Sequence, residues 1–476
     1  MTNATSSNRS RLWKPALLTL LGLSAGAGAL FYLSEDVRQF VAVEGLDAIG
    51  SAAEDRMADA AQTSGEAGNV AAEFIETPII AREIAPDVWQ ATGVGNTHLI
   101  STSAGQVLFD TGLSTQAGKQ YKALEEALGE IDLSHIILSH SHADHSGGPK
   151  LWLRSGVDVV THEEFVEEQR YLTELQGYFW HRNRTLFPFM PEEPPTMDLI
   201  AYGGIEPTIE VDNDEPLSIE QGGVTMQVLA LPGAEGADNL VLWLPEQRIL
   251  FSGDFFGPIF PQFPNVFTMR GEKIRKPIEY IASLETVIAL DPLMIVPSHK
   301  DPITDQAVIR EGLVKMRDAV RFVHDATIAA MNDGKTVEQA MRDIALPAEL
   351  ALTQEHGRVS WAVKSIWEYY ATWFHFDRTT ELYPVAASEV YGDIVELAGG
   401  EALTQRARSL LDAGEPVKAL HLIDIVLEGG DDTPALEVRR DALMELKQRA
   451  QATTRNSYEL YWLDYRLRDT EERLAP

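Results

Sequence analysis

The residues best suited to chemistry form one short run, His140-Ser141-His142-Ala143-Asp144-His145, which holds three of the twelve histidines of the chain. The apolar run Ile136-Ile137-Leu138 directly before it predicts a short buried strand. Residues two apart cannot share a helix face, but they can converge from a loop at a strand end. Imidazole and carboxylate groups are ligands that zinc, iron and manganese accept. Because so polar a cluster is costly to bury without a cation, the run predicts a metal site rather than a polar turn.

The composition limits the class of protein. A chain of 476 residues is longer than one ordinary core requires, so two or three domains are expected. The formal net charge of −33 argues against a nucleic-acid partner, because a phosphate backbone needs basic surfaces. The chain has no cysteine, so neither disulfides nor thiolate ligands can contribute. An anionic substrate would need a local basic pocket in this acidic protein.

The N-terminal segment predicts export. Arg9, Arg11 and Lys14 precede residues 15–33, which carry no charge. This length is at the lower end for a membrane span, and the flanking positive charge would leave the rest of the chain outside the cytoplasm. The small residues 25–29 also offer signal-peptide cleavage sites, so residues 1–34 are predicted to be a signal anchor or a removed signal peptide. The mature protein is then expected in the periplasm, or on the membrane facing the periplasm or exterior.

The remaining chain divides into three parts by composition and periodicity. Residues 35–84 are rich in Ala, Gly, Glu and Asp and predict a flexible acidic linker. Residues 85–330 alternate short apolar strands with helical segments, which predicts an α/β domain, a β-sandwich with helices on both outer faces. Residues 331–476 are almost entirely helical in pattern and predict a separate all-α domain.

The run from His140 to His145 resembles the H-x-H-x-D-H signature of the metallo-β-lactamase fold superfamily. Four further motifs of that superfamily follow in order, so that the resemblance covers about residues 85–303. They are Leu231-Pro232-Gly233, Asp238-Asn239-Leu240, Phe251-Ser252-Gly253-Asp254 and Pro297-Ser298-His299. The resemblance implies an αββα sandwich in which a dinuclear metal centre activates a bridging hydroxide to attack an ester, amide or related bond.

Glu235 stands where most members of the superfamily have a third histidine ligand. This exchange resembles the alkylsulfatase branch, which has a glutamate there and an acidic bridging ligand at the place of Asp254. By this resemblance, one metal would take His140, His142 and Glu235, and the other Asp144, His145 and His299, with Asp254 between them. Two divalent ions, with Zn²⁺ the expected metal, favour a bound hydroxide near neutral pH, and Asp144 and Asp254 are the predicted catalytic carboxylates.

Two basic stretches are expected to bind the substrate. Asn265 and Arg270 match an asparagine and an arginine that contact sulfate in the alkylsulfatases, and Arg182 and Arg184 lie in a second similar stretch. The planar fork of arginine suits a tetrahedral oxyanion. Residues 357–472 resemble the alkylsulfatase dimerisation domain, which implies a homodimer. Members of the branch typically continue into a sterol-carrier-like domain, whereas this chain ends at Pro476, which weakens the expectation of long-chain surfactant substrates and leaves sulfate esters generally, or a different ester, as candidates.

The sequence therefore predicts an exported dinuclear metal hydrolase of a small anionic ester similar to an alkyl sulfate. The first alternative is another hydrolase of the same fold, such as a lactonase, phosphodiesterase or β-lactamase, although Glu235 argues against a conventional lactamase site. A di-iron flavoprotein of this fold would need a flavin domain that is not evident after the helical region. A non-catalytic, membrane-tethered dimerisation scaffold would gain nothing from seven ligand-type residues.

Overall fold

The computed structural model describes residues 77–187, 190, 205–233, 235–266 and 269–475, together with Val43, Glu44, Asp47, Gly50 and Ser51. The predicted signal or anchor segment, residues 1–34, lies outside the described residues. In the part of the chain that the structure describes, no helix is both long and apolar enough to cross a membrane.

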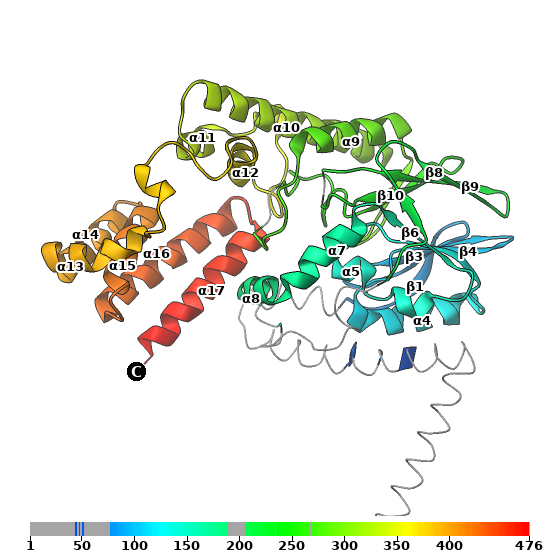
Figure 1. Ribbon diagram of the computed structural model, residues 1–476, viewed down its shortest axis with the longest axis horizontal. Coiled ribbons are helices and arrows are strands. Elements are labelled where there is room, and N and C mark those ends of the chain that lie inside the picture. The colour runs from blue at the N-terminus through cyan, green and yellow to red at the C-terminus, as the bar shows by residue number, and fades with distance from the viewer. Residues whose placement is uncertain are drawn as a thin grey trace, which may run out of the picture.

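The described residues form two β-sheets that pack face to face (Figure 1). The first sheet is antiparallel from β1 to β4 and parallel from β4 to β7. Its strands in spatial order are β1 (Ala81–Ala85), β2 (Val88–Ala91), β3 (Thr97–Thr102), β4 (Gly105–Phe109), β5 (Leu133–Ile137), β6 (Asp158–His162) and β7 (Ile209–Val211). The second sheet is antiparallel except between β11 and β12. Its strands in spatial order are β12 (Met294–Pro297), β11 (Ile249–Gly253), β10 (Leu240–Leu244), β9 (Val224–Ala230) and β8 (Leu217–Gln221).

Alternating apolar side chains explain why both faces of each sheet are covered. In β4, Val107 and Phe109 point into the core between the sheets, whereas Leu108 points to the outer face. In β10, Leu242 points into the same inner core and Trp243 points outward. Strands that are apolar on both sides require a layer of helices on each outer face, and this is the predicted αββα arrangement.

Helices cover each outer face. On the first sheet lie α4 (Ser114–Leu128), α5 (Ala143–Ser146) and α6 (Pro149–Trp152), with α7 (Phe165–Glu174) and α8 (Gln176–Leu186) beside them. On the second sheet lie α9 (Pro277–Leu290) and α10 (Gln306–Asn332), and α11 (Val337–Asp343) and α12 (Val359–Ala371) pack against α10 and continue the same core. Val363 and Ile366 of α12 belong to the same core as β10 and α10, so the helices that follow the predicted boundary at residue 330 pack directly against the first unit.

The C-terminal helices form a second layered unit, drawn in yellow to red in Figure 1. They are α13 (Tyr391–Ala398), α14 (Gly400–Asp412), α15 (Pro416–Leu427), α16 (Thr433–Ala452) and α17 (Ser457–Leu474), preceded by short 3₁₀ turns at Ala348–Leu350, Thr379–Leu382 and Ala387–Val390. Their core contains Ala407, Ile423 and Val438 from α14, α15 and α16. The last helix, α17, runs back beside α8 of the first unit (Figure 1).

A piece of the predicted flexible linker is instead packed against the first unit. Val43 is helical and buried in the core that contains Ala117 of α4. Lys122 of α4 forms ion pairs with Asp47 at 2.7 Å and with Glu44 at 2.9 Å. These contacts hold at least this stretch of residues 35–84 on the domain.

Candidate metal centre

Asp110 fixes the orientation of the imidazole of His145. It follows β4, and His140 to His145 follow the neighbouring parallel strand β5, so both segments leave the same edge of the sheet. The buried Asp110 carboxylate accepts hydrogen bonds from Ser139 N at 2.7 Å, Ser139 Oγ at 2.9 Å and Ser298 Oγ at 2.7 Å. It also accepts from His145 Nδ1 at 3.0 Å, which leaves His145 Nε2 available as a ligand. That Nε2 is buried and has no hydrogen-bond partner among the described residues.

Four of the predicted ligands already form a compact cluster. One ligand atom from each of Asp144, His145, Asp254 and His299 lies within 4.8 Å of the others. His299 Nδ1 donates to the carbonyl of Val94 at 2.5 Å, and its Nε2 lies 3.0 Å from Asp254 Oδ2 and 3.5 Å from Asp144 Oδ2. His145 Nε2 lies 3.4 Å from Asp144 Oδ2 and 3.5 Å from Asp254 Oδ2. Two imidazole nitrogens aimed at two carboxylates are a donor set that suits a divalent cation.

The charge balance of the cluster also fits a cation. Burial opposes charge on His145, but the carboxylates of Asp144 and Asp254 outweigh it and raise the pKa of His145 well above its usual value. Burial would likewise raise the pKa of Asp254, but His299 and His145 hold it well below the ordinary range. Protons on the imidazoles thus balance the carboxylates, and a metal ion would replace those protons.

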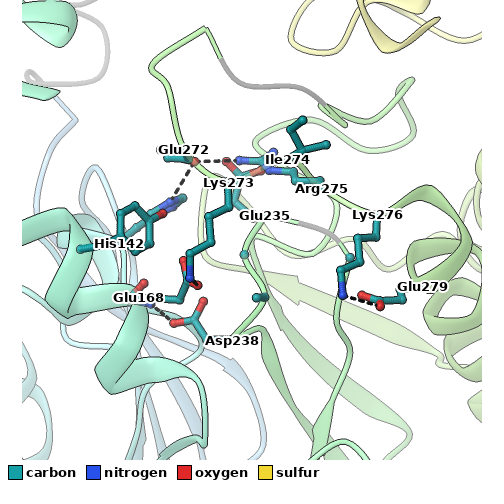
Figure 2. Close-up of a pocket in the computed structure, with 15 residues that line it drawn as sticks. His142, Glu168, Glu235, Asp238, Glu272, Lys273, Ile274, Arg275, Lys276 and Glu279 are labelled. Carbon is teal, nitrogen blue, oxygen red and sulfur yellow. Dashed lines mark hydrogen bonds and ion pairs between the residues drawn. The ribbon is translucent and has the colours of Figure 1, made fainter. Parts of the chain in front are cut away.

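The second predicted ligand set is only partly assembled. His140 Nε2 and His142 Nδ1 lie 2.8 Å apart, in direct hydrogen-bond contact, and burial lowers the pKa of His140 well below its usual value, which keeps it in the neutral, metal-binding form. Glu235 does not join them, because its carboxylate is held by Arg275 Nη1 at 2.7 Å and by Arg270 Nη2 at 3.3 Å. Instead, Oε2 of Glu272 lies 3.5 Å from His142 Nε2 (Figure 2).

The predicted substrate-binding residues occupy two different positions. Arg270 and Asn265 lie beside Glu235, and the Nε of Arg270 and the Oδ1 of Asn265 are buried without a hydrogen-bond partner in the described chain. Arg182 binds the backbone of the neighbouring loop. Its Nε donates to the carbonyl of Arg270 at 3.0 Å, and its Nη2 donates to the carbonyl of Met269 at 2.8 Å. It holds the loop that carries Arg270. Arg184, two residues further along α8, lies on a different side of that helix.

Two family models match this chain. Residues 91–299 match the metallo-beta-lactamase superfamily, and residues 336–467 match the alkyl sulfatase dimerisation domain. The chain joins a metallo-β-lactamase domain to an alkyl sulfatase dimerisation domain. The predicted fold is thereby confirmed, for the sandwich as well as for the helical domain.

The chain is similar to several proteins that are named alkylsulfatases. The chain is 28% identical over 337 residues to a linear primary-alkylsulfatase from Pseudomonas sp., an alignment that covers 67% of this chain and 62% of that protein. It is 26% identical over 412 residues to an alkyl/aryl-sulfatase from Saccharomyces cerevisiae, covering 79% and 62%. The structure of the stereoselective inverting sec-alkylsulfatase Pisa1 from Pseudomonas sp. superimposes with a TM-score of 0.70 at 20% identity, covering 88% of this chain and 71% of that one. The chain thus spans about 62% of the length of these two curated relatives.

The dimerisation domain contacts the loop that carries the predicted substrate-binding residue Asn265. Nδ2 of Asn456, which caps α17, donates to the carbonyls of Gln354 at 2.9 Å and His356 at 3.0 Å. The ring of His356 in turn lies 3.4 Å from Asn265 Nδ2 and 5.2 Å, between centroids, from the ring of Tyr458. The cap of helix α17 therefore positions the segment around His356, which contacts the predicted substrate-binding residue Asn265.

Sequence reasoning missed four residues of this site, which are Asp110, Glu272, His356 and Tyr458. A signal existed for Asp110, because an acidic residue that ends a strand beside the histidine strand is placed at the same sheet edge. His356 and Tyr458 carried no such signal, since about 90 or more residues separate them from the loop that they approach.

Proposed function

We propose that the protein is a metal-dependent hydrolase of sulfate monoesters similar to alkyl sulfates, and that it uses two divalent ions, with Zn²⁺ the expected metal. The observation that carries the proposal is the joint presence of the Asp144, His145, Asp254 and His299 cluster and the loop beside it that carries Arg270. The similarity to alkylsulfatases and the match of residues 336–467 to the alkyl sulfatase dimerisation domain support the substrate class.

The predicted site residues have two roles in this proposal, metal binding and sulfate binding. Asp144, His145, Asp254 and His299 would hold one ion, and His140, His142 and Glu235 the other, with Asp254 shared. Ions held there would supply Lewis-acid activation of water near neutral pH. Arg270 and Asn265 would bind and orient the sulfate group, because the planar guanidinium and the amide present donor atoms to a tetrahedral oxyanion. Arg182 would keep Arg270 in place through the loop carbonyls.

The test is metal analysis of the purified protein together with a panel of sulfate, phosphate, lactone and β-lactam substrates. We expect hydrolysis of sulfate esters, loss of activity with a chelator and recovery with zinc. Arg270→Met should raise KM for sulfate esters at least tenfold, whereas Arg310→Met, which removes a surface arginine paired with Asp291, should leave it unchanged. Hydrolysis of phosphodiesters or lactones but not sulfate esters would overturn the substrate class.

We also propose that the chain is exported and that it forms a homodimer. Residues 9–33, with their positive charges and uncharged run, support export, and fractionation of cells that express the full chain tests it. The dimerisation domain exposes large apolar side chains, including Phe376 at 87% and Leu397 at 88%, which supports burial against a second copy. A monomer by light scattering at micromolar concentration would contradict the homodimer.

A further inference from the structure

Glu272 is a buried carboxylate that none of the proposed metal or substrate contacts uses. Its side chain is 11% exposed and lies between the histidine run and the arginine loop. Oε1 lies 3.1 Å from Arg270 Nη2, and Oε2 lies 3.2 Å from Arg275 Nη2 and 3.5 Å from His142 Nε2 (Figure 2). It borders a cavity of about 50 Å³ that His142, Glu235 and Arg275 also line, which is room for a few water molecules.

The charges around Glu272 can be counted. Arg270 and Arg275 bring two positive charges, and the two carboxylates that contact both of them, Glu235 and Glu272, bring two negative charges. If Glu235 turns to the metal as proposed, Glu272 still balances one of the two guanidinium charges. One positive charge then remains for the substrate. A sulfate monoester carries one negative charge, so it completes the balance, whereas a doubly ionised phosphate monoester would place an extra negative charge beside a buried carboxylate.

We propose that Glu272 is a specificity-determining residue that adapts the arginine loop to singly charged esters and disfavours doubly charged phosphate monoesters. The inference rests on the proposed function for the position of the anion, at Arg270. Glu272 acts by repelling surplus negative charge and by occupying part of the donor capacity of Arg270 and Arg275. With Glu272 in place, the arginine loop can balance one singly charged anionic group.

The test compares two probes that are not hydrolysed and that have nearly the same shape, hexane-1-sulfonate and hexane-1-phosphonate, at a pH where the phosphonate is doubly ionised. Their dissociation constants are measured by calorimetry on the zinc-loaded wild-type protein and on Glu272→Gln, with Glu272→Ala as a second variant that removes the charge. We expect the affinity ratio to shift at least tenfold toward the phosphonate in both. The different affinities of the two head groups for zinc cancel, because the ratio is compared between proteins of equal metal content.

Two further variants separate charge from structure. Glu272→Asp keeps the charge and should retain most of the wild-type ratio. Glu279→Gln removes a carboxylate that lines the same cavity but pairs with Lys276 at 2.8 Å, and should change the ratio less than twofold (Figure 2). An unchanged ratio in Glu272→Gln and Glu272→Ala, or loss of metal from both, would overturn the proposal. Binding is read without turnover, so a failure to hydrolyse sulfate esters would count against the proposed function alone.

Discussion

Two buried aspartates lie behind the two halves of the proposed metal centre, and their hydrogen-bonding capacity is satisfied to different degrees. Asp110 accepts four hydrogen bonds, from Ser139, Ser298 and His145, and stands behind the assembled half. Asp238 accepts a hydrogen bond from Ser141 N at 2.8 Å, between His140 and His142, and its Oδ1 is buried without a partner among the described residues. Asp238 thus stands behind the half whose proposed carboxylate ligand, Glu235, is paired with Arg275.

The difference indicates how each half keeps its geometry. In the assembled half, both imidazoles are oriented by groups that do not depend on a metal, namely Asp110 for His145 and the carbonyl of Val94 for His299. In the other half, the carboxylate is held by two guanidinium groups, which a cation must outcompete. We therefore expect the first half to bind metal as a preformed site and the second to complete itself on binding.

The largest effect is expected from removing a ligand of the assembled half. His299→Ala should lose about one metal equivalent and lower kcat/KM by about 10³-fold, because Lewis-acid stabilisation is worth several kcal/mol. Metal analysis and sulfate ester kinetics measure both. His324→Ala, which removes a buried imidazole of α10 outside the cluster, is the control for the loss of a buried ring. Full metal content in His299→Ala would contradict the assignment.

A smaller loss is expected when the anchor is changed and the ligands are kept. Asp110→Asn retains the size of the side chain but weakens the hold on the His145 ring, so metal affinity at the assembled half should fall about 10- to 100-fold. Competition with a chelator measures the affinity, and activity should return at raised zinc concentration. An affinity equal to that of the wild-type protein would show that His145 needs no anchor.

The contrast between the halves also explains what could be predicted from the sequence. Asp254 and His299 lie at strand ends, and their distance from the histidine run is set by the fold, so ordered motifs sufficed to place them. Glu235 was matched by position, but its rotamer depends on Arg270 and Arg275, which a motif does not encode. Glu272 lies in a stretch that was interpreted as basic, so its carboxylate was not predicted to belong to the site. Arg182 was expected to bind substrate, and the structure shows its contacts with backbone carbonyls, which the sequence pattern did not indicate.

A stepwise metal titration distinguishes the two halves by their affinity for the ion. Because Glu235 must leave Arg275 before it can bind metal, the second ion should bind at least about tenfold more weakly than the first. Calorimetric titration of the metal-free protein with zinc should show two steps, and Glu235→Ala should remove the weaker step and spare the stronger one. Two equal steps, or loss of the stronger step in Glu235→Ala, would contradict the division into halves.

The smallest effect concerns stability and follows from the poorly satisfied anchor. Burial, reinforced by Glu168, raises the pKa of Asp238 to about 6 in the folded protein. A carboxyl group whose pKa is raised on folding stabilises the fold in its protonated form. That contribution is fully present below the unfolded pKa of about 3.9 and is lost as the pH rises through 6. At neutral pH the ionised Asp238 is therefore a cost to the metal-free protein.

Asp238→Asn should remove this cost, because the amide oxygen can still accept from Ser141 N. We expect a gain of about 3 kcal/mol in the free energy of unfolding at pH 7.5, falling to about 1 kcal/mol at pH 4.5, since about two pKa units separate the folded and unfolded states. Thermal unfolding of the metal-free variant and wild-type protein at both pH values measures the difference. The matching change at the other anchor, Asp110→Asn, should destabilise the protein at pH 7.5, because the amide keeps only one of the two carboxylate oxygens that together accept four hydrogen bonds. Effects of the same sign at the two positions would show that the anchors do not differ.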